Sequence, residues 1–159
     1  MPEQIEGETL TQPDRFRVVA WWSSGQSGIA KSNSSPSAIH FTSPPSLGGE
    51  EGRRTPQDFL LSALVSSYTT TFRGLAEKLH LEHTDLEVEV EGIGDSQGNQ
   101  TFEELLVRAV LIIPHPEQYA QAMDLLNETS RLCFSSQAPS IKRSFEARVT
   151  VRLCGYATG

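Results

Sequence analysis

The sequence predicts an α+β fold, in which β-strands precede, separate and follow two helices. Three observations support this prediction. A helical pattern begins at Thr55, residues 85–91 alternate strictly between apolar and acidic side chains, and residues 145–153 alternate between apolar and polar or charged ones. Side chains on one helix face recur every three or four residues and those on one strand face every two, so the period identifies the element.

The chain has 159 residues, the length of one domain. Residues 1–14 are polar with an acidic bias, which predicts a flexible N-terminal tail ahead of a single domain over residues 15–159. Only 37% of the residues are hydrophobic, and residues 23–56 are rich in Ser, Pro and Gly. Because the apolar residues are concentrated in the remainder, we expect a partner subunit to cover shared surface.

The residues before the first helix are predicted to be extended strands and loops. Residues 16–23 are aromatic and β-branched, which predicts a strand, and Gly25–Gly28 predicts a turn into a second short strand. Residues 38–41 form a third extended segment. Residues 44–54 contain Pro and Gly throughout and are predicted to be a loop.

The first helix is predicted from about Pro56 to about His80. Thr55 suits the N-cap, Pro56 the first helical position and Asp58 the positive end of the helix dipole. Helical spacing places one set of residues on a common face: Leu60, Ala63, Leu64, Ser67, Thr71, Gly74 and Leu75. We therefore expect Ser67 to point the same way as the apolar stripe.

The second half predicts strand, strand, helix, strand. Residues 85–91 read as a half-exposed antiparallel strand, and residues 101–113 as its hairpin partner, with a helical first turn as the alternative. A second helix is predicted to open at His115, with Cys133 directly after it, and residues 145–153 are predicted to form the last strand. The order is β-β-(β)-α-β-β-α-β.

The first helix carries an unbroken row of hydroxyl side chains at its centre, from Ser66 to Thr71. Such residues are neutral to poor helix formers and cost free energy when they are buried without partners. The row therefore marks either a site of chemistry or a place where chemistry has been lost.

Charge and composition exclude several classes of function. The net charge is −7, and no cluster of Lys and Arg exceeds a pair such as Arg53-Arg54, so nucleic-acid binding is disfavoured. No apolar run is long enough to span a membrane, and no signal peptide is recognised, so the expected location is cytoplasmic. The two cysteines, Cys133 and Cys154, and four scattered histidines form no zinc motif, and no metal or cofactor is expected.

Several motifs occur in a characteristic order: Pro44-x-x-Leu-Gly-Gly, Thr55-Pro-x-x-Phe-Leu-Leu-x-Ala-Leu, Leu75-Ala, and Cys133-x-x-Ser136 before the last strand. In this order the chain resembles the osmotically inducible and organic-hydroperoxide-resistance proteins (OsmC/Ohr). The resemblance implies an intertwined homodimer, in which two central helices are wrapped by antiparallel sheets from both chains. It also implies an active site in the subunit interface.

The family chemistry implied is reduction of organic hydroperoxides by a cysteine pair. One thiolate attacks the peroxide and becomes a sulfenic acid, and a second cysteine closes a disulfide on it. An arginine and a glutamate orient the attacking thiolate, and the arginine lowers its pKa.

When the family's site positions are transferred to this chain, several of them carry a different residue type. The attacking position, eleven residues after Pro56, is Ser67, and the glutamate position is Gln57. The arginine position reads Gln26, with Arg53 or Arg54 as alternatives. Cys133 stands at the position of the resolving thiol. A serine hydroxyl cannot form a sulfenic acid, so the two-cysteine mechanism is not expected here.

Three functions are then in competition. The first is a binding protein with an apolar pocket at the dimer interface for a small hydrophobic molecule or an organic hydroperoxide. That pocket would be lined by Phe59, Ala63 and Tyr68, with Ser67 and Gln57 as polar groups.

The second is a one-cysteine peroxidase using Cys133. Arg131 would lower the pKa of its thiol, and Ser67, Ser135 and Ser136 would donate hydrogen bonds to its thiolate. The third is a Ser67 hydrolase, whose base would be His40.

Overall fold

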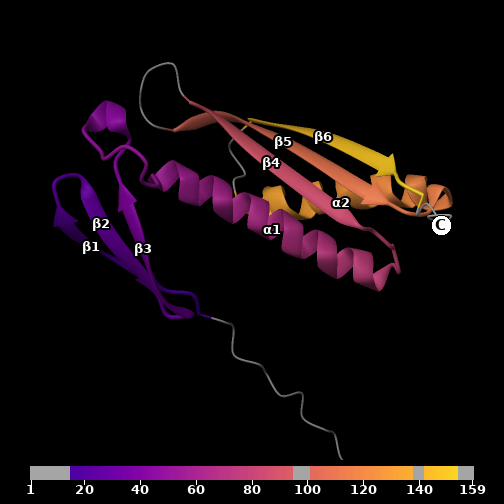
Figure 1. The fold of residues 1–159 in the computed structure, drawn as a ribbon, viewed down its shortest axis with the longest axis horizontal. Helices are drawn as coiled ribbons and strands as arrows, with labels where there is room; N and C mark the ends of the chain where they lie inside the picture. Colours follow the sequence, from indigo (N-terminus) through magenta and orange to yellow (C-terminus); the bar gives the residue numbers. More distant parts are fainter. Residues whose placement is uncertain (1–14, 95–100, 138–141, 154–159) are drawn as a thin grey trace, which may run out of the picture. The chain divides into compact units, whose positions relative to one another are not determined.

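The computed structural model describes residues 15–94, 101–137 and 142–153, with the backbone alone for residues 134–137. The chain divides into two compact units, one ending at Pro56 and the other beginning at Gln57. Figure 1 traces both along the sequence. The predicted tail over residues 1–14 and the thiol of Cys154 lie outside the described residues.

The first unit contains a three-stranded antiparallel sheet. Its strands are β1 (Val18–Ser24), β2 (Ser27–Ser32) and β3 (Ser35–Thr42), in the order β1-β2-β3. The third segment, predicted only as a short extended piece, is thus a full strand. Trp21 pairs with Ile29, and Ile29 pairs with His40, so all three strands are in register across the middle of the sheet.

The loop after β3 explains the Pro44-x-x-Leu-Gly-Gly motif. Pro45–Leu47 forms a single 3-10 turn, η1, and Gly48 follows it with φ +82°, a conformation that favours glycine. A Cβ at Gly49 would overlap the carbonyl oxygen of Ser43. The motif is therefore required by a tight turn.

The second unit begins with helix α1 (Pro56–Lys78), with Asp58 in its first turn and Lys78 in its last. His80 (φ 52°) ends the helix in a left-handed conformation, and Leu81 N–H bonds the carbonyl of Ala76 at 2.9 Å. This is a Schellman-type C-cap, which satisfies a carbonyl at the end of the helix.

The remaining elements form a mixed sheet and a second helix. Strands β4 (Asp85–Gly94) and β5 (Phe102–Ile113) are antiparallel, a 3-10 turn η2 (Pro116–Gln118) leads into α2 (Tyr119–Gln137), and β6 (Lys142–Val151) returns parallel to β5. The helical alternative for the first turn of residues 101–113 is wrong, because β5 begins at Phe102. The sheet is mixed rather than purely antiparallel because α2 carries the chain back to the starting end of β5.

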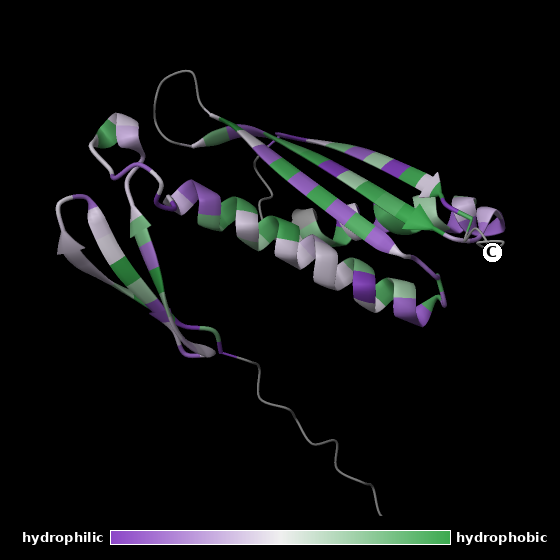
Figure 2. Ribbon diagram, viewed as in Figure 1, coloured by the Kyte–Doolittle hydropathy of each residue, from purple (hydrophilic) through white to green (hydrophobic). Residues whose placement is uncertain are grey.

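The core of the second unit lies between the sheet and the two helices, which cover the same face of the sheet in Figure 1. Figure 2 shows the alternation of polar and apolar residues along β4, as the sequence predicts. The buried cluster contains residues of α1, α2 and the strands, together with Leu81 of the loop after α1: Leu64, Tyr68, Phe72, Ala76, Leu81, Leu105, Val107, Ala109, Leu111, Ile113, Ala122, Leu125, Leu126, Cys133 and Val149.

The buried stripe of α1 differs from the predicted one by about one residue. Leu64, Tyr68, Phe72 and Ala76 are buried, at every fourth position, whereas three residues of the predicted face, Leu60, Ala63 and Gly74, are exposed. Ser67 and Thr71 lie half-buried at the edge of the stripe. The large rings of Tyr68 and Phe72 occupy the core, and burying these rings is worth more than burying Ala63 or Gly74.

Candidate functional site

The two positions that the family resemblance singles out, Ser67 and Cys133, are neighbours in the structure. Ser67 lies near the middle of α1 and Cys133 in the penultimate turn of α2. The Cys133 thiol donates a hydrogen bond to the backbone carbonyl of Ser67 at 3.4 Å. Cys133 was predicted to follow the second helix; it lies within it, because α2 continues to Gln137.

Cys133 is a free thiol in a shielded position, with 4% of its surface exposed. In this contact the sulfur is the donor, so the carbonyl of Ser67 donates no hydrogen bond to it. A peroxidatic cysteine requires the opposite arrangement, with groups that stabilise the thiolate.

The arginine expected to activate Cys133 is engaged elsewhere. Arg131 is exposed and bonds the carboxylate of Glu128, with 3.0 Å from its Nε to Glu128 Oε2. This contact raises the pKa of Arg131 and lowers that of Glu128. The side chains of Ser135 and Ser136, proposed as donors to a thiolate, lie outside the described residues.

The hydroxyl row of α1 bonds its own helix. Ser66 Oγ donates to Ala63 O at 3.0 Å, Thr69 Oγ1 to Val65 O at 2.8 Å, and Thr70 Oγ1 to Ser66 O at 2.9 Å. Bonds to a carbonyl one turn back let hydroxyl residues occupy a helix without a further partner. For Ser66, Thr69 and Thr70, these bonds account for the row without any chemistry.

Tyr68, predicted to line a pocket, is fully buried in the core. Its hydroxyl donates to the carbonyl of Leu126 at 2.8 Å, and its ring lies 6.0 Å from that of Phe145. Burial raises the pKa of Tyr68 well above its ordinary value, and the neighbouring Cys133 adds to the shift. Among the other predicted lining residues, Phe59 and Gln57 are half-buried and Ala63 is exposed.

The three polar residues expected from the first unit take part in its own contacts. The Gln26 side chain accepts a hydrogen bond from Ser43 Oγ at 3.2 Å, and Arg54 O accepts one from Thr42 N–H at 3.0 Å. Arg53 forms an ion pair with Glu50, three residues before it.

Glu50, Ser27 and Thr42 form a hydrogen-bonded cluster that was not predicted from the sequence. Ser27 Oγ donates to Glu50 Oε1 at 2.9 Å, and Glu50 N–H donates to Thr42 Oγ1 at 3.1 Å. The Ser27 hydroxyl and then the Arg53 guanidinium hold the pKa of Glu50 below its ordinary value. The i,i+3 spacing of Glu50 and Arg53 was the available signal, but spacing alone does not indicate pairing in a loop.

Within the described residues, no cluster of three or more His, Cys, Asp or Glu could hold a metal ion. No helix in the same part of the chain is long and apolar enough to cross a membrane.

Comparison with known proteins agrees with the motifs. The family model described as OsmC-like protein matches residues 48–151. The uncharacterized protein YmaD of Bacillus subtilis is 24% identical over 144 residues, which cover 88% of this chain and 96% of YmaD.

Two solved structures show the same fold. An OsmC-like protein from Mycoplasma pneumoniae superposes with a TM-score of 0.69 at 17% identity, covering 88% of this chain and 99% of the other. An organic hydroperoxide resistance protein, OsmC, from Legionella pneumophila superposes with a TM-score of 0.65 at 18% identity, covering 89% and 100%. Because the family model matches well over half of the sequence, the chain belongs to the OsmC-like protein family.

Proposed function

We propose that this OsmC-like protein retains the scaffold of a hydroperoxide reductase, lacks the two-cysteine mechanism, and binds a small hydrophobic molecule at the interface of a homodimer. The observation that supports it is the pair of Ser67 and Cys133. The two positions lie in contact, yet residue 67 supplies a hydroxyl where the family chemistry requires a sulfur.

The residue types at this pair support the proposal that the protein is not a disulfide-forming peroxidase. Forming a disulfide on residue 67 requires a sulfenic acid there, and an alcohol is not oxidised to one. The half-buried position of Gln57 carries a neutral amide in place of a carboxylate, which removes the cost of desolvating a charge. A free, buried thiol at Cys133 suits the reducing cytoplasm, which is the compartment we propose.

The proposed ligand site lies beside Ser67, with Phe59 and Ala63 as apolar lining, Tyr68 behind them, and Ser67 and Gln57 as polar groups. An exposed Ala63 and an exposed Leu60 on α1 leave apolar surface that a second copy would cover. An organic hydroperoxide is one molecule of suitable chemistry; it would be bound there without being reduced.

The proposal is tested by the consumption of an organic hydroperoxide in the presence of excess dithiol. We expect the protein and its Cys133→Ser variant to show no turnover above the background reaction, whereas Ser67→Cys should gain turnover. Native mass spectrometry of the same preparations then identifies a retained small molecule, whose occupancy should fall in Gln57→Leu and Ser67→Ala.

Turnover by the unmodified protein that disappears in Cys133→Ser would replace this proposal with the one-cysteine peroxidase. Ester hydrolysis that disappears in Ser67→Ala would replace it with the hydrolase.

A further inference from the structure

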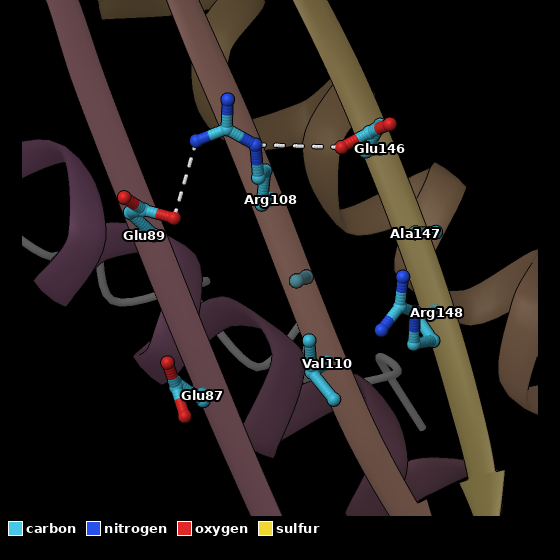
Figure 3. A pocket seen from close by; sticks show the side chains of 8 residues that line it. Glu87, Glu89, Arg108, Val110, Glu146, Ala147 and Arg148 are labelled. Atoms are coloured by element: carbon cyan, nitrogen blue, oxygen red, sulfur yellow. Dashed lines mark hydrogen bonds and ion pairs between the residues drawn. The ribbon is translucent and has the colours of Figure 1, made fainter.

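The outer face of the β4–β6 sheet carries a hollow of about 210 Å³, which lies on the side of the sheet away from its core. Figure 3 shows side chains from all three strands around it. Its walls carry charge of both signs, and its lining comprises Glu87, Glu89, Arg108, Ala109, Val110, Glu146, Ala147 and Arg148.

One of the two arginines of the hollow is fully engaged. Arg108 N–H groups lie 3.2 Å from a Glu89 oxygen, 3.4 Å from a Glu91 oxygen and 3.4 Å from a Glu146 oxygen. These contacts raise the pKa of Arg108. Arg108 therefore closes one end of the hollow with its positive charge offset by three carboxylates, which leaves this cluster acidic.

The other two charged side chains of the hollow, Glu87 and Arg148, lie outside the Arg108 cluster. Glu87 on β4 and Arg148 on β6 both pair with Val110 of β5, so they flank this half-buried valine from opposite sides. Among the described residues neither one forms an ion pair or a hydrogen bond through its side chain. Two strand spacings of roughly 4.8 Å separate their backbones by about 10 Å, which is too far for a direct contact without a large lean of both side chains.

Glu87, Val110 and Arg148 present a carboxylate, an apolar surface and a guanidinium in a row. A ligand that contacts all three must carry a cation, an apolar group and an anion in the same order. An ammonium group suits Glu87, a carboxylate suits the fork of Arg148, and an aliphatic group suits Val110. We propose that this hollow binds a zwitterionic, peptide-like small molecule, with its ammonium at Glu87, its carboxylate at Arg148 and its apolar part on Val110.

This site is separate from the pair of Ser67 and Cys133, so either proposal can fail without the other. The walls are solvent-exposed, and exposed charge contacts are individually weak. We therefore expect dissociation constants in the millimolar range, on the order of 1 mM, that rise with ionic strength.

The dipeptide glycyl-leucine is a suitable probe, followed by ¹H–¹⁵N NMR titration of the intact protein. Saturable shifts are expected at the amides of Val110 and Arg148. Glu87→Gln and Arg148→Gln should each weaken binding by about fivefold. Glu104→Gln is the matched control, because Glu104 lies on the outer face of β5 but pairs with Lys142 outside the hollow.

The N-acetylated, C-amidated dipeptide has the same apolar side chain but no charges, and we expect no saturation with it. The proposal is overturned if glycyl-leucine gives no saturable shift up to about 50 mM, if the capped dipeptide binds equally well, or if either charge variant leaves the affinity unchanged. All three substitutions are on exposed or half-exposed positions, and an unchanged NMR spectrum outside the hollow verifies that the variants are folded.

Discussion

The contact between Cys133 and residue 67 runs through a backbone carbonyl, so it does not depend on the serine side chain. A sulfur placed on residue 67 would therefore start within reach of the Cys133 thiol. Disulfides need Cα atoms roughly 4.4–6.8 Å apart, a separation compatible with a thiol that touches the backbone of its partner residue.

We predict that Ser67→Cys forms a disulfide with Cys133 when it is treated with a stoichiometric hydroperoxide. Peptide mapping under non-reducing conditions and a count of free thiols measure the bond. Ser66→Cys is the matched control, since Ser66 is exposed and bonds Ala63 on another side of the helix; it should keep its thiol free. Equal cross-linking of both variants would contradict the assigned geometry.

Tyr68 provides a test of the core at a single hydroxyl group. Its bond to Leu126 O is buried, and removing one partner of such a bond costs about 1 kcal/mol. We predict that Tyr68→Phe lowers the free energy of unfolding by about that amount in urea titrations. Tyr119→Phe, at a ring that is 47% exposed, should lie within about 0.5 kcal/mol of the unmodified protein.

At the level of elements, the loop that follows β3 is held to β2 by Glu50. Its carboxylate bonds Ser27 and Arg53, and its folded-state pKa is therefore lower than its unfolded-state pKa. A depressed pKa means that the unfolded state binds the proton more readily. The stabilisation is then present above the unfolded pKa and is lost as the pH falls through the folded one.

We predict that Glu50→Gln destabilises the protein at neutral pH and that its difference from the unmodified protein shrinks as the pH falls below about 4.5, the ordinary value for a glutamate. Urea unfolding at a series of pH values gives the measurement. Glu51→Gln is the neighbouring control, because Glu51 forms no ion pair with a described residue. A difference for Glu50→Gln that stays constant with pH would show that the carboxylate does not titrate with folding.

The two helices illustrate what pattern analysis can and cannot establish. The start of α1 at Pro56 followed from Thr55, Pro56 and Asp58, since capping preferences act within one turn. The buried face of α1 did not follow from the sequence. Whether Ala63, Ser67 or Tyr68 points into the core depends on the volume left by α2 and β5. The same holds for Arg131, which bonds Glu128 one helical turn away instead of acting on Cys133.

On the scale of the assembled molecule, the first unit exposes several large apolar side chains at and just before β1. Phe16 is 84% exposed, Trp22 is 77% exposed, and Val18 and Trp21 are more than half exposed. Exposed large aromatic side chains are typical of an interface. A second copy of this chain is the partner that the proposed homodimer supplies.

We predict that the protein sediments as a dimer and that Trp22→Glu weakens dimerisation by tenfold or more, on the order of the loss of an interface hot spot. Analytical ultracentrifugation over a concentration series gives the dissociation constant. Leu47→Glu serves as a control, because Leu47 is 47% exposed on η1 and is not part of a strand. A monomer at all concentrations would refute the homodimer and the interface pocket together.

The element types, their order and the family of this protein follow from the sequence, because periodicity, capping and glycine-dependent turns are local properties of the chain. The assignment of Ser67 to the family's attacking position also comes from the sequence, through its spacing from Pro56, and it stays a prediction. The tertiary structure alone decided the rotation of α1, the parallel return of β6 and the bond between Ser27 and Glu50. It also brought Cys133 against the carbonyl of Ser67 and left Glu87 and Arg148 facing each other across Val110. Each of these depends on which distant residues compete for the same space or the same charge, and no local pattern records that competition.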